Sequence, residues 1–522
     1  MKRHSETNPS RASLAYGFEH SFSSPDRKLL SLLHLFQGYV NSNVLLFMCK
    51  GPVEWALPEL RDISKANISH VLDTAAEIGL LTARGGDHYS IHPAVPWFLK
   101  RHFDHYYPSD VSPDSARAAF PATRAFVETM GHFGHNFLMI YELGGRRDLG
   151  HLIDEEPNFL NAIAFSLAHE WWRPAVACLE GLFPLYQQTG RRAAWLTVFS
   201  RVVPFFLAND ERPIPGREAY WSIFMDYRLR QAMEAQTWPE AERLASAIID
   251  NERPLAVPLL NVEPSSLDAQ QSSVIRGFAT ALGRLGDVRR ERQDPRCLEA
   301  YREAIQLYQH IDEKMGEATR CFNVGHAYKN IGVIQDLDQA EVWYRRSLNL
   351  RPEHDKLARG QCLAQLGSLA LKRLTKAKRS DSADEVLIKE FTAAVDFYKQ
   401  ALELIPVEAV GDIANLHNQL GIAYANSRKH LDLAIEHLQE ALRSFEALGE
   451  QHMAGGVRNN LAMILLAAGR VAEARDYAEA AITTLEKCRV PSDELIRSAK
   501  NVRRDAERRL QLEAPPPDTE HI

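Results

Sequence analysis

The segment from Cys321 to Arg351 places small and large side chains at the spacing of two packed antiparallel helices. The positions are Val324, Gly325 and Tyr328 in the first helix, Ala340, Tyr344 and Ser347 in the second, and Pro352 as the terminating residue. Small residues let the helices approach closely, and a large residue about once per turn fills the groove of the neighbouring pair. The segment is therefore expected to be one helix pair that stacks on others.

The same pattern occurs four more times along the C-terminal half. The corresponding residues are Leu282, Gly283, Cys297, Tyr301 and Ala304; Leu366, Gly367, Ala394, Tyr398, Ala401 and Pro406; Leu420, Gly421, Tyr424, Ala434, Leu438 and Ala441; and Leu461, Ala474, Ala478 and Ala481. The pattern resembles the tetratricopeptide repeat, whose usual period is about 34 residues. The central anchors at 301, 344, 398, 438 and 478 are 43, 54, 40 and 40 residues apart, so either the helices or the loops are enlarged. Because each pair buries its apolar face only against its neighbours, we predict an all-α superhelix with a concave side over residues 261–490.

Length and composition limit the class of protein. The chain has 522 residues, 45% of them hydrophobic, and a net charge of -7, which is typical of a soluble protein with several structural units and gives no general affinity for nucleic acid. The six cysteines contain no C-x-x-C pair, which favours reduced core cysteines in a cytoplasmic protein. Neither a secretion signal nor a run of about 18 apolar residues occurs, so we expect no membrane partner.

Residues 25–110 predict a winged helix. A helix is expected over Pro25 to Met48, and Ser64 can cap a second helix that ends at Gly79. Residues 80–83 and 88–92 alternate as two short strands around a four-residue turn. Residues 1–24, which precede this domain, are predicted to be a polar leader.

The other segments are less regular. Residues 111–260 predict irregular helical repeats, and the prolines from Pro254 to Pro264 are typical of a linker to the regular array. Residues 491–512 predict a capping helix, and residues 513–522, which contain three consecutive prolines, predict a disordered tail. One stripe of aromatic residues at helical spacing is interpreted as core, and its members are Phe183, Tyr186, Trp195, Phe199 and Phe205.

The order of these segments resembles a known family. "SLAYGFEHSFSSPDRKLLSLLHLFQG" is followed by "DTAAEIGLLTARGGDHYSIHP", then by "DEEPNFLNAIAFSLAHEWW", and then by the repeats. This order is similar to the C-terminal part of bacterial STAND proteins, signal-transduction ATPases related to the NB-ARC class, and the resemblance covers about residues 12–510. In that family a P-loop NTPase domain precedes the winged helix, and the repeats sense an inducer or hold the protein inactive. The resemblance therefore implies a sensor or regulatory arm.

One feature of the family is missing from this sequence. No G-x-x-x-x-G-K-S/T motif occurs, so the backbone and lysine that would hold nucleotide phosphates are absent, and we expect neither ATP hydrolysis nor a cofactor. His92 falls where the family's winged helix carries a histidine that contacts phosphates, although a surface or packing histidine is the alternative. The chain would then be a separated sensor arm, or one part of a split switch that includes a separate P-loop NTPase or effector chain.

Other chemistry receives little support. The pairs His102 with His105 and His132 with His135 each share a helical face, but no Glu-x-x-His motif accompanies them, so no metal is expected. No G-x-S-x-G or H-E-x-x-H motif occurs either, which argues against an enzyme. The second helix of the winged helix has Lys65 against two acidic residues, a net charge of -1, which disfavours insertion into a DNA groove.

The concave side of the repeats is the remaining candidate site. An amide is expected to project inward from four first helices, at Asn323, Gln365, Gln419 and Asn460. Nearby side chains that could add specificity are His326, Lys329, Lys372 and Asn426. Such amides can bond to the backbone of an extended peptide, or they can connect adjacent helices. A basic run in the enlarged third unit is either a solvated extension or a contact for an acidic partner, and its members are Lys372, Arg373, Lys376, Lys378 and Arg379.

These observations favour a non-enzymatic repeat scaffold that binds a protein or a peptide. A transcription regulator that binds DNA through the winged helix is the first alternative, and a nucleotide-dependent switch completed by a separate chain is the second. Binding to random duplex DNA would distinguish the first alternative from the scaffold. The chemistry of a groove does not by itself identify the partner.

Overall fold

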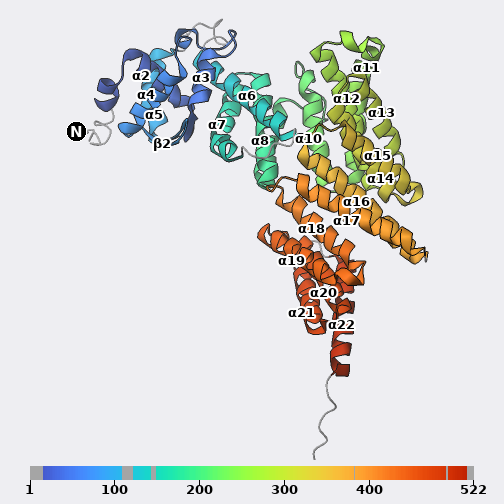
Figure 1. Ribbon diagram of the computed structural model, residues 1–522. Helices are drawn as coiled ribbons and strands as arrows, with labels where there is room; N and C mark the ends of the chain where they lie inside the picture. Colours follow the sequence, from blue (N-terminus) through green and yellow to red (C-terminus); the bar gives the residue numbers. More distant parts are fainter. Residues whose placement is uncertain (1–15, 109–120, 143–148, 381, 489–491, 514–522) are drawn as a thin grey trace, which may run out of the picture. The chain divides into compact units, whose positions relative to one another are not determined.

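The computed structural model describes residues 16–108, 121–142, 149–380, 382–488 and 492–513 (Figure 1). The chain divides into two compact units, Met1–Phe224 and Met225–Ile522, and each is described by itself. Most of the predicted polar leader and nearly all of the predicted tail lie outside the described residues. Within the described residues, no helix is both long enough and apolar enough to cross a membrane.

The first unit begins with a helix-rich domain that also contains a small sheet. Residues 16–21 are helical and Phe18 is fully buried against Phe98 and His102, so the predicted polar leader ends earlier than residue 24. The elements that follow are α2 (Ser24–Ser31), η1 (Leu32–Leu35), β1 (Tyr39–Asn41), α3 (Ser42–Lys50), η2 (Pro58–Leu60), α4 (Lys65–Glu77), β2 (Leu81–Gly85), β3 (His88–Ile91) and α5 (Ala94–Tyr106).

The prediction of one helix over residues 25–48 is wrong. Gly38 adopts φ 76°, in the left-handed region where glycine is favoured, and strand β1 follows it before α3 begins. Asn41 caps α3 by accepting a hydrogen bond from the Asn43 amide. Strand β1 pairs antiparallel with β3, so the sheet has three strands in the order β1-β3-β2.

The other predicted elements of this domain are present. The Ser64 side chain accepts a hydrogen bond from the Asn67 amide and caps α4. Strands β2 and β3 form the predicted hairpin, and the positive φ angles of Gly85 and Gly86 lie in its turn. This order of elements agrees with the predicted winged helix, with one strand more than expected.

The rest of the first unit is helical. Its elements are α6 (Pro121–Glu142), α7 (Leu149–Ala168), α8 (Trp172–Gln188), α9 (Arg192–Val202), η3 (Val203–Phe205) and η4 (Glu218–Tyr220). Helices α6 and α8 touch through two glycines, because a Cβ atom on Gly181 would lie 2.4 Å from the Cα atom of Gly134. Four of the five predicted core aromatics are buried, but Phe205 is 41% exposed and the prediction of a core position is wrong there.

The second unit is a stack of helix pairs, confirming the predicted all-α superhelix (Figure 1). Its helices are α10 (Trp221–Glu234), which begins in the first unit, α11 (Trp238–Ala256), α12 (Ala269–Glu291), α13 (Cys297–His310), α14 (Lys314–Asn330), α15 (Leu337–Leu350), α16 (Lys356–Arg379), α17 (Asp384–Leu404), α18 (Val410–Ala425), α19 (Leu431–Ala447), α20 (Gln451–Ala467), α21 (Val471–Glu486) and α22 (Asp493–Glu513). The short 3-10 helices are η5 (Val257–Asn261), η6 (Pro264–Ser266), η7 (Gly332–Ile334) and η8 (Arg428–His430). The segment predicted as a linker thus forms the end of α11 and η5.

The five predicted pairs pack through their small and large anchors. The ring of Tyr344 is fully buried, and a Cβ atom on Gly325 would lie 2.7 Å from it. Gly367 has the same relation to the ring of Tyr398. Each glycine therefore lets a tyrosine ring lie directly against the backbone of the preceding helix.

The first pair, the third unit and the end of the stack each add a detail to the predicted pattern. In the first pair the ring of Tyr301 lies against Gly286, whereas the predicted anchor Gly283 faces the Arg320 side chain. The long interval in the third unit comes from its helices, because α16 has 24 residues and α17 has 21, compared with 16 in α18 and 17 in α19. At the end of the stack, α22 packs on α21 and buries Ala499 and Ala506.

Candidate peptide-binding pocket of the repeat array

A pocket of about 450 Å³ lies in the middle of the repeat array. Three first helices, α14, α16 and α18, supply most of its walls, and α17 and the residue after it supply two more side chains. The lining residues are Phe322, His326, Lys329, Gln361, Ala364, Gln365, Ser368, Tyr398, Ile405, Asp412, Asn415, Leu416 and Gln419. The volume falls in the range of about 300 to 1,000 Å³ that is usual for ligand sites.

The Lys329 ammonium group is the positive charge in the lining of this pocket, and the Asp412 carboxylate is the negative one. The residue is 8% exposed, and its Nζ atom donates to Gln365 Oε1 at 2.5 Å and to Ser368 Oγ at 3.4 Å. Burial, together with the charge of Lys372, lowers the pKa of Lys329 to about 8. Both acceptors are neutral, so the positive charge has no carboxylate partner among the described residues.

His326 lies beside Lys329 on the same face of α14. Its ring makes edge contacts with Phe322 and Tyr344, at centroid distances of 4.6 Å and 5.5 Å. Burial, with smaller contributions from Lys329 and Arg290, lowers the pKa of His326 to about 3. The imidazole is therefore neutral at neutral pH and offers hydrogen bonds without a charge.

Other polar side chains connect the helices across the floor of the pocket. Gln361 Nε2 donates to Asp412 Oδ1 at 3.0 Å, which links α16 to α18. The Tyr398 hydroxyl donates to Gln419 Oε1 at 3.5 Å. Asn415 is exposed and makes no hydrogen bond among the described residues. The pocket thus combines fixed acceptors and donors with one amide that is open to a ligand.

The structure brings four of the eight predicted site residues together in this pocket, namely His326, Lys329, Gln365 and Gln419. Lys372 lies next to it, where its Nζ atom donates to the Lys329 carbonyl oxygen at 3.1 Å and to Asn330 Oδ1 at 3.3 Å. It therefore holds the C-terminal end of α14 in place.

The remaining three predicted residues do not line the pocket: Asn323 and Asn460 connect helices, and Asn426 bonds to its own helix. Asn323 Nδ2 donates to Asp287 Oδ1 at 2.8 Å, which links α14 to α12. Asn460 Nδ2 donates to Asn418 Oδ1 at 3.1 Å, which links α20 to α18. Asn426 Nδ2 donates to the Ile422 carbonyl oxygen at 2.9 Å. Two of the four predicted amides, Asn323 and Asn460, thus connect helices, while Gln365 and Gln419 line the pocket.

Sequence reasoning missed four polar lining residues: Gln361, Ser368, Asp412 and Asn415. A usable signal was present, because Gln361 and Ser368 lie four and three residues from Gln365. Residues at these spacings share a helical face. The same rule relates Asn415 to Gln419.

The basic run of α16 contacts neighbouring units. Arg373 pairs with Asp338 and Glu341, both at 2.6 Å, which connects α16 to α15. Lys378 Nζ donates to the Asn426 carbonyl oxygen at 2.6 Å, on the side of α18. These two cations already have partners within the array.

Two candidate histidines of the first unit, His132 and His102, pack against aromatic rings, whereas His92 contacts no ring in the described part of the chain. The ring of His132 stacks on Phe47 at 4.4 Å, and His102 packs against Phe18. His92 is exposed, and its Nδ1 atom accepts a hydrogen bond from the Ala94 amide. Among the described residues, no group of three His, Cys, Asp or Glu side chains is arranged to hold a metal ion.

The helix that would enter a DNA groove carries no free basic charge at its start. Lys65, its first residue, forms an ion pair with Asp87 at 2.6 Å, so the carboxylate balances the lysine charge. On the same helix, Asp73 accepts a hydrogen bond from the Tyr89 hydroxyl. Lys65 is the one lysine or arginine of this helix, so the helix offers little positive charge for a phosphate.

The comparisons with known proteins agree on the repeats. Residues 412–487, from α18 to the end of α21, match the family profile described as "Tetratricopeptide repeat". No curated protein sequence matches the chain.

Solved structures give the fold alone. The crystal structure of a Signal Transduction ATPase with Numerous Domains protein with a tetratricopeptide repeat sensor, PH0952 from Pyrococcus horikoshii, is similar over 98% of this chain, with 13% sequence identity and a TM-score of 0.52. This chain spans 63% of that chain's length. BtubC (BKLC) from P. vanneervenii matches 55% of this chain and 96% of its own, with 18% identity and a TM-score of 0.36. The profile match and the stacked helix pairs together make the second unit a superhelix of tetratricopeptide repeats.

Proposed function

We propose that the chain is a scaffold that binds a segment of another protein in the pocket of the repeat array, and that it performs no catalysis. The observation that carries the proposal is the convergence of α14, α16 and α18 on one pocket with a buried, uncompensated Lys329 charge. Tetratricopeptide arrays present an extended concave surface to partners. The neutral His326 and the open Asn415 amide can bond to a peptide backbone.

We further propose that this scaffold acts as the sensor arm of a signalling system in the bacterial cytoplasm. The similarity in fold to a STAND protein with a repeat sensor supports this proposal, as does the order of the sequence segments. The five cysteines that are buried and the one that is half-buried form no disulfides, which agrees with a reducing compartment. The partner would then be a P-loop NTPase or an effector chain.

The experiment compares partner capture by the wild type and by an Asn415→Ala/Gln419→Ala variant. Loss of two hydrogen bonds to a desolvated peptide, at about 0.5 to 1.5 kcal/mol each, lowers affinity by roughly 5- to 150-fold. Melting is expected to change little, because Asn415 has no hydrogen bond with another described residue and Gln419 makes one at 3.5 Å.

A matched control places the same chemistry outside the pocket. Asn349 on α15 and Gln400 on α17 are exposed and do not line the pocket, so Asn349→Ala/Gln400→Ala is expected to capture partners like the wild type. Affinity of each captured partner is then measured by calorimetry. Equal affinity of both double variants for every partner would locate the binding surface elsewhere on the array.

A further inference from the structure

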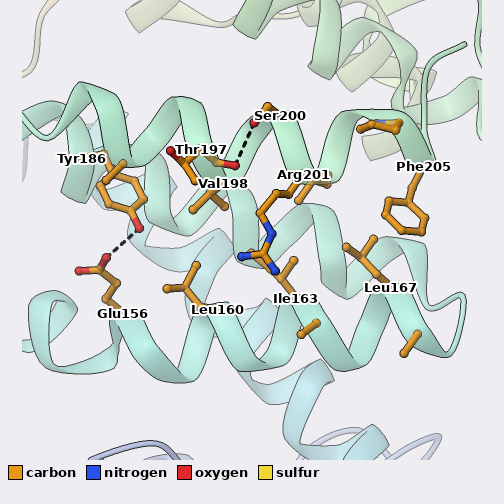
Figure 2. Close-up of a pocket in the computed structure, with 15 residues that line it drawn as sticks. Glu156, Leu160, Ile163, Leu167, Tyr186, Thr197, Val198, Ser200, Arg201 and Phe205 are labelled. Carbon is orange, nitrogen blue, oxygen red and sulfur yellow. Dashed lines mark hydrogen bonds between the residues drawn. The ribbon is translucent and has the colours of Figure 1, made fainter. Parts of the chain in front are cut away.

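A second cavity lies within the first unit, in a groove between α7 and α9 (Figure 2). Its volume is about 830 Å³, which is within the usual range of about 300 to 1,000 Å³ for small-molecule sites. Most of its walls are apolar, and the apolar lining residues are Leu160, Ile163, Ala164, Leu167, Ala168, Ala194, Val198, Val202, Pro204 and Phe205. The exposure of Phe205, which the sequence pattern assigns to the core, is explained by its place in this lining.

Almost every polar group of the lining already has a partner within the protein. The Glu156 carboxylate accepts hydrogen bonds from the Tyr186 hydroxyl at 2.7 Å and from Arg191 at 2.5 Å and 2.9 Å. The Thr197 and Ser200 hydroxyls donate to carbonyl oxygens of their own helix at 2.9 Å and 3.0 Å. The carboxylate at one end of the groove is thus neutralised, and neither hydroxyl needs a ligand.

Arg201 is the exception. Its side chain extends from α9 into the space between the two helices (Figure 2), and it makes no hydrogen bond or ion pair with any other described residue. A guanidinium group offers five donors in a planar fork that matches a carboxylate. The groove therefore presents one uncompensated positive charge against an apolar wall.

From this geometry we infer that the groove binds a small amphiphilic carboxylate, a molecule with an unbranched acyl chain and one terminal carboxylate. The acyl chain lies against Leu160, Ile163 and Leu167 of α7, and the carboxylate pairs with the Arg201 fork. A cationic amphiphile would find no free acceptor in the lining, because the Glu156 carboxylate already accepts hydrogen bonds from Arg191. An uncharged amphiphile would leave the Arg201 guanidinium group without a partner. This site is separate from the pocket of the repeat array in both its residues and its chemistry.

The test is calorimetric titration of the full chain with decanoate, decanol and decylamine below their micellar concentrations. We expect saturable binding of one decanoate per chain, at least about tenfold weaker binding of decanol, and no binding of decylamine, because only decanoate satisfies both the apolar wall and Arg201. Absence of saturable decanoate binding would overturn the inference, as would decanol binding that equals decanoate binding. Saturation only by an amphipathic helical peptide would also overturn it.

Variants separate the charge from the shape of the groove. Arg201→Gln is expected to weaken decanoate binding about tenfold or more and to leave decanol binding unchanged, whereas Arg201→Lys retains part of the affinity. Ala164→Trp fills the groove from an exposed position of α7 and is expected to abolish binding of both ligands. Arg61→Gln removes one charge from an exposed site outside the groove and serves as the matched control. Equal decanoate affinity of the Arg201→Gln and Arg61→Gln variants, both folded by circular dichroism, would refute the role of Arg201.

Discussion

Two buried tyrosines at equivalent repeat positions are predicted to respond in opposite ways to the loss of their hydroxyl groups. Tyr344 is fully buried, and none of the described residues forms a hydrogen bond with its hydroxyl. Tyr301 is equally buried, but its hydroxyl donates to Asp287 Oδ1 at 2.8 Å. Both rings lie against a glycine of the preceding helix, so Tyr301→Phe serves as the matched comparison for Tyr344→Phe.

The magnitudes follow from these contacts. An unpaired buried hydroxyl costs about 1 to 3 kcal/mol of desolvation, and the small void that replaces it costs a few tenths, so Tyr344→Phe is expected to stabilise the array by about 1 to 2 kcal/mol. A hydrogen bond to a charged group contributes about 1.5 to 3 kcal/mol. Since Asp287 keeps its bonds to Asn323 and Arg320, Tyr301→Phe is expected to destabilise the array by about 1.5 to 2 kcal/mol, near the lower limit.

The assay is native-state hydrogen exchange of the full chain, followed separately for α12–α13 and α14–α15. This measurement is preferred because a repeat array does not have to unfold in one step, whereas exchange reports the opening free energy of each pair. Protection is expected to rise in α14–α15 for Tyr344→Phe and to fall in α12–α13 for Tyr301→Phe. Any loss of protection in α14–α15 on Tyr344→Phe would refute the reasoning.

Three further predictions concern activity, pH and helix packing. Because the sequence has no P-loop motif, calorimetry with the full chain is expected to detect no ATP binding at micromolar concentrations. The Nδ1 atoms of His417 and His437 lie 2.9 Å apart, and burial lowers the pKa of both below the usual 6.5, so the stability that they contribute is present above pH 6.5 and lost at lower pH. Melting temperatures measured between pH 7.5 and pH 5 should therefore fall less steeply in a His417→Asn/His437→Asn variant than in the wild type, and an unchanged slope would contradict the assignment. Gly181→Ala forces a backbone shift against α6 and should lower the free energy of unfolding by about 1 to 3 kcal/mol. In Gly411→Ala the new methyl group meets only Leu448 at 3.9 Å, and the free energy of unfolding should rise by about 0.5 to 1 kcal/mol. Equal melting temperatures of these two variants would count against the contact between Gly181 and α6.

The repeats could be predicted from the sequence because their anchors are close in the chain and each has a local packing reason. Tyr344 and Gly325 illustrate this, since the spacing alone predicts that a small and a large residue meet. Strand β1 could not be predicted in the same way. Its three residues are stabilised by pairing with β3, which lies about 50 residues later in the chain.

The candidate site was only partly predictable. A helical register identifies which residues share one face of a helix, and Gln365 and Gln419, chosen in this way, both line the pocket. It does not show which of these amides find a partner on the next helix. The Asn323 amide donates its hydrogen bond to Asp287, and this contact depends on the distance between two repeats. The exposure of Phe205 likewise depends on the groove beside α7, which helical periodicity does not describe.

The extended helix α16 has a mechanical consequence for the array. Its last two turns are bonded to α15 on one side through Arg373 and to the end of α18 on the other through Lys378. A stack of repeats can bend at each contact between adjacent units, because each unit contacts only its neighbours. A helix that is bonded to the units on both of its sides resists bending at those two contacts. We therefore expect the elasticity of the superhelix to be concentrated towards its two ends, with a stiff segment around the pocket.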